Sequence, residues 1–244
     1  MAGGYRFPRI TNQRIVRSDA VVPIVGEKFC RASEERQLTV QKTSLFYPGD
    51  GFAVYEHQRW RHVGLVFRVD SYGYDSHHVM GRRAPARDEV VLMGPCGDCI
   101  LTVRRKVGRV PGEKVDGQKP LFSARRHSIV GNSAGIFVEV YGMGGTGHRE
   151  YRVEGSFSQR CCTVYYAHSD GVSTLTEAEE GSAAVVAEIR RKVVVSSASS
   201  AADVVSDNMV LGKDVFCLRL APGFDAAFSM GLVLMLDQIT GDNV

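Results

Sequence analysis

The apolar stretch GFDAAFSMGLVLMLDQI, from Gly223 to Ile239, restricts the fold more than any other part of the chain. It carries no charge between Asp225 and Asp237. A helix that spans a bilayer needs roughly 20 predominantly apolar residues, and this uncharged run is too short for that. As a helix, the segment has apolar side chains on every side, so that no face suits water. It is therefore predicted to be a central helix that the rest of the chain encloses. The helix residues expected to be buried in this way are Phe228, Leu232, Val233, Met235, Leu236 and Ile239.

Short strands rich in β-branched and aromatic residues recur before this helix. In YRVEGSF, the apolar Tyr151, Val153 and Phe157 alternate with polar residues, which is the pattern of a half-buried strand. The same kind of segment occurs as LVFRVDS from Leu65, ILTVRRK from Ile100, IFVEVYG from Ile136, CTVYYAH from Cys162, AVVAEIRRK from Ala184 and VFCLRL from Val215. Turns containing glycine and proline separate the strands. The pattern predicts a mainly β fold, a barrel filled by the hydrophobic C-terminal helix.

The composition is that of a folded protein. Hydrophobic residues make up 44% of the 244 residues and charged residues 23%. The formal net charge is only +3, which by itself indicates neither a nucleic-acid nor a membrane partner. The N-terminal sequence MAGGYRFPRITNQRIVRSDAVV lacks the apolar centre and cleavage site of a secretory signal. We therefore expect a cytoplasmic protein with six reduced cysteines and no transmembrane segment, and we keep peripheral association with the plasma membrane and entry into the nucleus as alternatives.

Four blocks of sequence, in this order, resemble the plant LURP-one-related family. They are LTVQKTSLFYPGDGFAVYE from Leu38, GLVFRVDSY from Gly64, DEVVLMGPCGDCILTVRRK from Asp88 and the C-terminal DAAFSMGLVLMLDQI. Together they cover most of the chain between Leu38 and Ile239. The chain departs from the family at Gln41, where a Trp is common, and in the basic turn HQRWRHV and the long loop at 72–87.

The resemblance implies a fold similar to the C-terminal domain of tubby proteins and to phospholipid scramblases. That fold is a closed antiparallel β-barrel of about twelve strands around a central hydrophobic helix. It implies a single domain over residues 31–244, preceded by an N-terminal extension over residues 1–30. The family is implicated in basal defence against pathogens, and tubby-like domains bind phosphatidylinositol bisphosphate through basic residues of the barrel.

Two glycine-rich motifs are interpreted as turns. GMGGTG at 142–147 satisfies the dinucleotide-binding pattern, and GNSAG at 131–135 would make Ser133 a hydrolase nucleophile. Both mechanisms need a helix directly after the motif, whereas HREYRVEGSF and IFVEVYG alternate as strands. Neither motif is therefore expected to bind a cofactor or to act in catalysis.

The cysteines and histidines form no convincing metal site. Cys96 and Cys99 stand in a C-x-x-C turn, but a structural zinc site needs four ligands, and the adjacent Cys161 and Cys162 point to opposite faces of a strand. A redox pair of this type normally opens a helix. His77 and His78 have no partner at ligand spacing. We expect no metal, no cofactor and no catalytic residue, and hence a protein that is not an enzyme.

Basic clusters at strand ends are the candidate binding site. If these ends converge on one rim, their side chains could bind several phosphate oxygens of a phosphoinositide at once. The clusters contain Arg104, Arg105, Lys106, Arg125, Arg126, Arg190, Arg191 and Lys192. The alternative is that these residues are solvated or paired, as Glu188 and Arg190 could be.

The sequence therefore predicts a monomeric, non-enzymatic protein of defence-linked signalling that reversibly binds anionic phospholipid, a protein partner, or both. A scaffold without lipid binding and a scramblase-like lipid-translocating protein are the alternatives. Sequence-specific nucleic-acid binding is not expected, because the chain offers no recognition helix for the major groove.

Overall fold

A computed structural model of the chain describes residues 23–42, 51–57, 63–70, 89–104, 120–127, 135–141, 149–167, 184–195 and 208–240. The long loop expected at 72–87 lies outside the described residues. Within the described part, strands dominate, and one α-helix, α1 (Ala226–Thr240), stands at the C-terminal end. The mainly β fold with a C-terminal helix that the sequence predicts is thereby confirmed.

The strands follow one another along the chain with two short 3₁₀ turns, η1 (Glu27–Phe29) and η2 (Phe157–Gln159). They are β1 (Arg36–Gln41), β2 (Gly51–His57), β3 (Val63–Asp70), β4 (Glu89–Met93), β5 (Cys99–Arg104), β6 (Phe122–His127), β7 (Gly135–Val140), β8 (Arg149–Ser156), β9 (Cys161–Ala167), β10 (Ala184–Arg191), β11 (Val193–Val195), β12 (Asn208–Val210) and β13 (Val215–Leu220).

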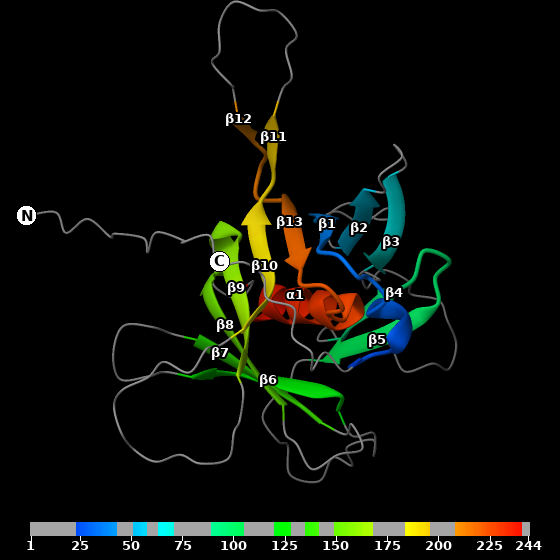
Figure 1. The fold of residues 1–244 in the computed structure, drawn as a ribbon, viewed down its shortest axis with the longest axis vertical. Coiled ribbons are helices and arrows are strands. Elements are labelled where there is room, and N and C mark those ends of the chain that lie inside the picture. The colour runs from blue at the N-terminus through cyan, green and yellow to red at the C-terminus, as the bar shows by residue number, and fades with distance from the viewer. Residues whose placement is uncertain are drawn as a thin grey trace, which may run out of the picture.

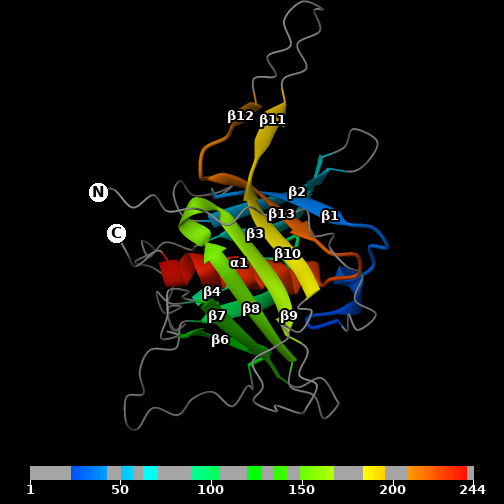
Figure 2. The same cartoon turned by 60° about the vertical axis from the view of Figure 1, so that its left-hand side comes forward.

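Eleven of these strands form one sheet in the order β5-β4-β3-β2-β1-β13-β10-β9-β8-β7-β6. Neighbouring strands are antiparallel throughout the described pairs, and β1 joins the two halves of the chain by pairing with β13. The sheet curls around α1, which lies inside it in both views (Figures 1 and 2). Its two edges are β5 and β6, and no described strand pair joins them. The hairpin of β11 and β12 projects beyond the ends of β10 and β13.

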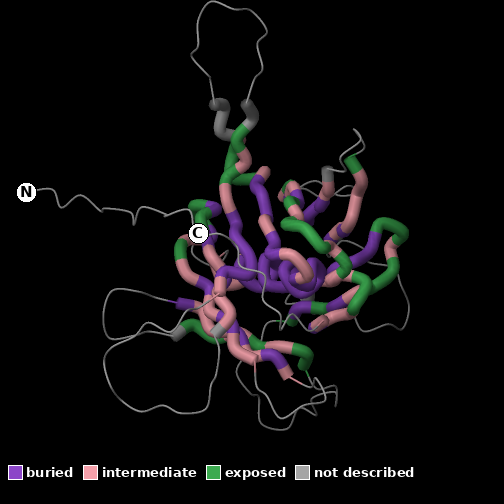
Figure 3. The backbone as a smooth tube through the Cα atoms, in the orientation of Figure 1, coloured by how far each residue is buried: buried purple, intermediate pink, exposed green. Residues whose placement is uncertain are grey.

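The helix forms the centre of the core, which Figure 3 shows as the buried tube at the middle of the molecule. Every residue from Ala226 to Leu236 is buried, and none of them carries a charged side chain that burial would desolvate. Phe228, Leu232, Val233, Met235 and Leu236 are each at most 7% exposed, and Ile239 packs against the core while partly exposed. The sheet thus supplies the enclosure that an all-round apolar helix requires.

Gly231 lets both edges of the sheet approach the helix closely. A Cβ atom at this position would lie 3.1 Å from Cζ of Phe122 on β6 and 3.4 Å from Cδ2 of Leu101 on β5. Phe122 also stacks edge-on against Phe228, with ring centroids 5.2 Å apart. Side chains of the two edge strands therefore meet on one turn of α1, which brings the sheet around the helix.

Asp225 begins the helix and also holds the N-terminal segment. Its Oδ1 atom accepts hydrogen bonds from the backbone N–H groups of Ala227 and Phe228, both at 3.0 Å, as an N-cap residue does. Its Oδ2 atom accepts from the backbone N–H groups of Ile24, Val25 and Gly26 at 3.0, 2.7 and 3.2 Å. The carboxylate is fully buried. One side chain therefore joins residues about 200 positions apart in the sequence.

The substitution Asp225→Asn is expected to destabilise the fold by at least about 3 kcal/mol, because an amide nitrogen cannot accept the hydrogen bonds that one carboxylate oxygen accepts now. Urea unfolding followed by circular dichroism measures the effect. Asp214→Asn is the matched control, since Asp214 is exposed and its described hydrogen bond is made by its backbone carbonyl. Equal stability of the two variants would contradict the role assigned to Asp225.

Candidate functional site

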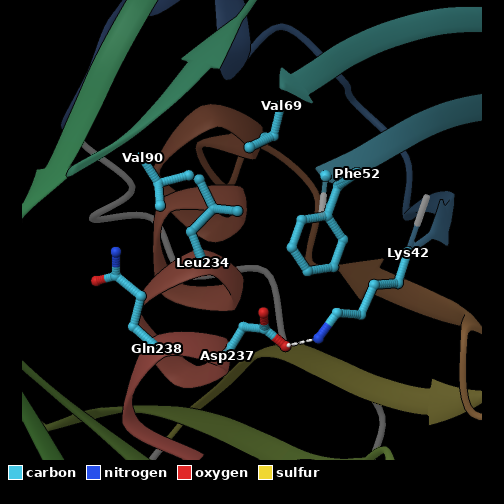
Figure 4. Close-up of a pocket in the computed structure, with 8 residues that line it drawn as sticks. Lys42, Phe52, Val69, Val90, Leu234, Asp237 and Gln238 are labelled. Atoms are coloured by element: carbon cyan, nitrogen blue, oxygen red, sulfur yellow. Dashed lines mark hydrogen bonds and ion pairs between the residues drawn. The ribbon is translucent and has the colours of Figure 1, made fainter. Parts of the chain in front are cut away.

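The C-terminal end of α1 is the part of the core that opens toward the surface, and two pockets flank it. One pocket, of about 70 Å³, is lined by Leu234, Asp237 and Gln238 of the helix together with Lys42, Gly51, Phe52, Val69 and Val90 (Figure 4). Within it, Nζ of Lys42 forms an ion pair with Oδ1 of Asp237 at 3.0 Å. Because a water molecule occupies roughly 30 Å³ of liquid, this pocket has room for little more than solvent.

The second pocket is larger, about 220 Å³, and we call it the mouth pocket. It lies between the last turns of α1, the strands β6 to β9 and the turn η2. Its described lining consists of Arg126, Gly135, Ile136, Val153, Gly155, Ser156, Phe157, Ser158, Cys162, Leu236 and Thr240. The mouths of β-barrels are a common place for small-molecule sites.

Arg126 reaches the mouth pocket because β6 alternates its faces. Phe122 packs against the helix, Ala124 packs against the core, and Arg126 follows on the same face. The guanidinium is exposed, and its Nη2 donates a hydrogen bond to the carbonyl oxygen of Ile239 at 2.7 Å. The C-terminal end of a helix carries partial negative charge, which favours a cation there. The contact thus places a positive charge at the open end of the core.

Arg160 directly follows the turn η2 and has a strained, left-handed backbone conformation, with φ 53°. Its Nε donates to the carbonyl oxygen of Lys213 at 2.8 Å, and its guanidinium lies 4.2 Å from the ring centre of Phe157 and 4.6 Å from that of Phe216. Burial lowers the pKa of Arg160, an effect that the nearby Asp237 opposes. The ring contacts and hydrogen bond fix the cation beneath η2, where it supports one wall of the mouth pocket.

Two of the predicted binding residues are neutralised by carboxylates. Arg125 points away from Arg126 and forms an ion pair with Glu139 at 2.9 Å. Arg190 pairs with Glu188 at 2.7 Å, and this buried carboxylate also binds Arg219 at 3.0 Å. The pairing of Glu188 with Arg190, which the sequence offered as the alternative to ligand binding, is therefore present.

Arg126 and Arg191 instead contact uncharged oxygen atoms. Nε of Arg191 donates to the carbonyl oxygen of Gln159 at 3.3 Å, and Nη2 lies 3.4 Å from the side-chain Oε1 of the same residue. Both arginines are exposed. No carboxylate partner is found for either among the described residues, so that their charges are not compensated by a salt bridge there.

The other predicted basic residues are dispersed. Arg104 is exposed at the end of β5, and Lys192 donates to Oγ1 of Thr39 at 2.6 Å. Arg105 and Lys106 lie outside the described residues. The end of β10, which carries Arg190 and Arg191, lies on the opposite side of α1 from β6 in both ribbon views (Figures 1 and 2). The structure thus places the clusters of β6 and β10 on two sides of the helix.

The cysteines of the C-x-x-C motif, Cys96 and Cys99, are both exposed at the hairpin between β4 and β5. Gly97 adopts φ 91° in this turn, a conformation that suits glycine. The motif at 142–147, Ser133 and the pair His77 and His78 fall outside the described residues. Among the residues with described positions, no three His, Cys, Asp or Glu side chains are grouped to hold a metal ion. In the same part of the chain, no helix has the length and apolarity to cross a membrane.

Two cationic residues of this region, Lys42 and Arg160, were not among the site residues predicted from the sequence. Lys42 ends the strand-like segment LTVQK, so that its position at a strand end was recognisable from the sequence. Arg160 follows a predicted strand, but no pattern of residue types shows that its guanidinium stacks on two rings. Its position depends on the left-handed backbone conformation that Arg160 adopts directly after η2, which is known only from the structure.

The fold and the open end of its core define a class of protein in which an antiparallel sheet encloses one apolar C-terminal helix.

A model of the LURP-one-related family matches residues 36–237. The chain is 47% identical over 228 residues to Protein LURP-one-related 5 of Arabidopsis thaliana, covering 91% of this chain and 90% of that protein. It is 44% identical to Protein LURP-one-related 12 of the same plant, covering 90% and 85% of the two chains. No solved structure matches. The chain belongs to the LURP-one-related family.

The thiol of Cys162, on the wall of the mouth pocket, is expected to resist alkylation in the folded protein. Burial raises its pKa to about 12, so that at pH 8 only about one thiol in ten thousand is the reactive thiolate. The neighbouring Cys161 is exposed and serves as an internal control. Mass spectrometry after brief iodoacetamide treatment should find Cys161 modified and Cys162 unmodified until urea is added. Modification of both residues at similar rates in the native protein would contradict the described burial.

Proposed function

We propose that this LURP-one-related protein is a non-enzymatic binding protein that associates reversibly with anionic phospholipid, above all phosphoinositide headgroups, from the cytoplasmic side. Its place in defence-linked signalling is proposed from what the family resemblance implies. Membrane association of this kind is peripheral and electrostatic, and it does not require insertion of α1, whose apolar surface is buried against the sheet. Binding of a protein partner is the second part of the proposal.

The observation that carries the proposal is the difference between two pairs of arginines. Arg125 and Arg190 have carboxylate partners, whereas Arg126 and Arg191 are exposed and bind uncharged oxygens among the described residues. A guanidinium already paired with a carboxylate gains little from a phosphate, because the new contact replaces an equivalent one. A guanidinium bound to a carbonyl has a neutral partner, so that its charge is not compensated. Arg126 and Arg191 are therefore the preferred phosphate ligands.

No catalytic step is part of the proposal. The described lining of the mouth pocket offers a guanidinium, hydroxyl groups and the Cys162 thiol with its raised pKa. A nucleophile needs an adjacent general base or a lowered pKa, and burial acts on Cys162 in the opposite direction. These side chains suit binding better than group transfer.

Vesicle binding tests the proposal with two double variants of equal charge change. Purified protein is sedimented with phosphatidylcholine vesicles that contain or lack phosphatidylinositol bisphosphate, at low and physiological salt. Binding to the phosphoinositide vesicles should weaken as salt rises, because salt screens exposed charges. Arg126→Gln with Arg191→Gln should reduce the binding constant about thirtyfold, since each of the two lost charge-assisted contacts contributes on the order of 1 kcal/mol.

The matched control is Arg125→Gln with Arg190→Gln, which removes the same formal charge from residues that carboxylates already neutralise. Its binding constant should stay within about twofold of the unmodified protein. Equal losses in both double variants would show that only net charge matters. If the unmodified protein fails to bind either kind of vesicle, the lipid proposal is wrong and binding of a protein partner is left.

A further inference from the structure

We propose that the mouth pocket is a binding site for a small amphipathic carboxylate, a molecule with one carboxylate group and an apolar body of about six to ten carbon atoms. The size estimate follows from the pocket volume of about 220 Å³, because an apolar cavity of roughly 150 Å³ holds benzene. This ligand is a free molecule in solution, so the inference does not depend on membrane binding.

The floor of the mouth pocket is apolar and rigidly supported. Leu236 and Val153 are buried, and Ile136 packs against the core from β7. The ring of Phe157 and the thiol of Cys162 complete this surface, and both residues are 4% exposed. The guanidinium of Arg160 beneath Phe157 holds that ring in place. An apolar body placed here would bury its surface against side chains that need no rearrangement, which favours binding.

The rim of the mouth pocket is polar and has one charged residue among its described lining. Arg126 provides this positive charge, and Ser156, Ser158 and Thr240 add hydroxyl groups. The hydroxyl groups of Ser156 and Ser158 lie 3.0 Å apart, and that of Thr240 donates to the carbonyl oxygen of Leu236 at 2.8 Å. An apolar floor beneath a single cation matches a ligand that is apolar at one end and anionic at the other.

For a small ligand held inside the mouth pocket, a carboxylate fits better than a free phosphate ion. The planar guanidinium of Arg126 donates one hydrogen bond to Ile239, which leaves further N–H groups of its five to face a bidentate oxygen pair. The C-terminal end of α1 carries partial negative charge, and it repels a doubly charged group more strongly than a singly charged one. Inside the pocket, where Arg126 is the one charged residue of the described lining, a singly charged ligand is therefore balanced better than a doubly charged one.

Titration calorimetry of the full chain with octanoate tests the inference. One saturable site is expected, with 1-octanol binding at least about tenfold more weakly because it lacks the charge. Inorganic phosphate, which lacks the apolar body, should not compete. Arg126→Gln should weaken octanoate binding at least about tenfold. Arg125→Gln, on the opposite face of the same strand, should leave octanoate binding unchanged. Arg191→Gln should also leave it unchanged, because Arg191 belongs to the proposed phosphoinositide site but not to the described lining of the mouth pocket.

A blocked pocket provides the second arm of the test. Ile136→Trp fills the floor from β7, and Thr240→Phe fills the rim from the end of α1, so that a fold defect in one variant does not prevent the test. Each variant is first checked by circular dichroism. Loss of octanoate binding in a folded blocked variant supports the site. Absence of saturable binding to the unmodified protein, or unchanged binding in a folded blocked variant, would overturn it.

Discussion

The buried carboxylate of Asp225 is the contact on which the rest of the structure depends. It accepts two hydrogen bonds from the first turn of α1 and three from the backbone of residues 24–26. The same side chain therefore starts the helix and closes the N-terminal segment over that end of the core. Unpaired backbone N–H groups in a dry core are costly, so the burial of this helix end is possible only with such a partner.

This arrangement gives the two ends of α1 different properties. The N-terminal end is sealed, and the apolar residues up to Leu236 are enclosed by the sheet. The C-terminal end reaches the surface, where Lys42 binds Asp237 and Arg126 binds the carbonyl group of Ile239. Cations gather at this end because the helix carries partial negative charge there. The partial negative charge of this helix end thus favours the position of Arg126, the one cation that both proposed ligands share.

Much of the fold can be predicted from the sequence, because the signals are periodic. The length and all-round apolarity of 223–239 identify an enclosed helix, alternation identifies β8, and a short run rich in apolar residues identifies β13. Asp225 could have been recognised as an N-cap from its place before the helix. Its contact with residues 24–26 could not, because a bond between backbone groups and a distant carboxylate has no signature in residue type.

The candidate site is less predictable for a similar reason. Adjacent arginines look equivalent in sequence, yet Arg125 and Arg126 lie on opposite faces of β6, with a carboxylate partner for one and a carbonyl for the other. On β10, Glu188 lies directly opposite Arg219 of β13, so that this one carboxylate pairs with both Arg190 and Arg219. Strand register and pairing therefore determine which charges remain available, and neither can be derived from the spacing of basic residues alone.

The most direct test of this account is nuclear magnetic resonance of the arginine Nε–H groups while a soluble short-chain phosphatidylinositol bisphosphate is added. The account predicts that the signals of Arg126 and Arg191 shift in a saturable manner while those of Arg125 and Arg190 stay in place. Shifts confined to Arg125 and Arg190, or no saturable shift in any of the four, would contradict the claim that carboxylate pairing decides which arginines bind the anion.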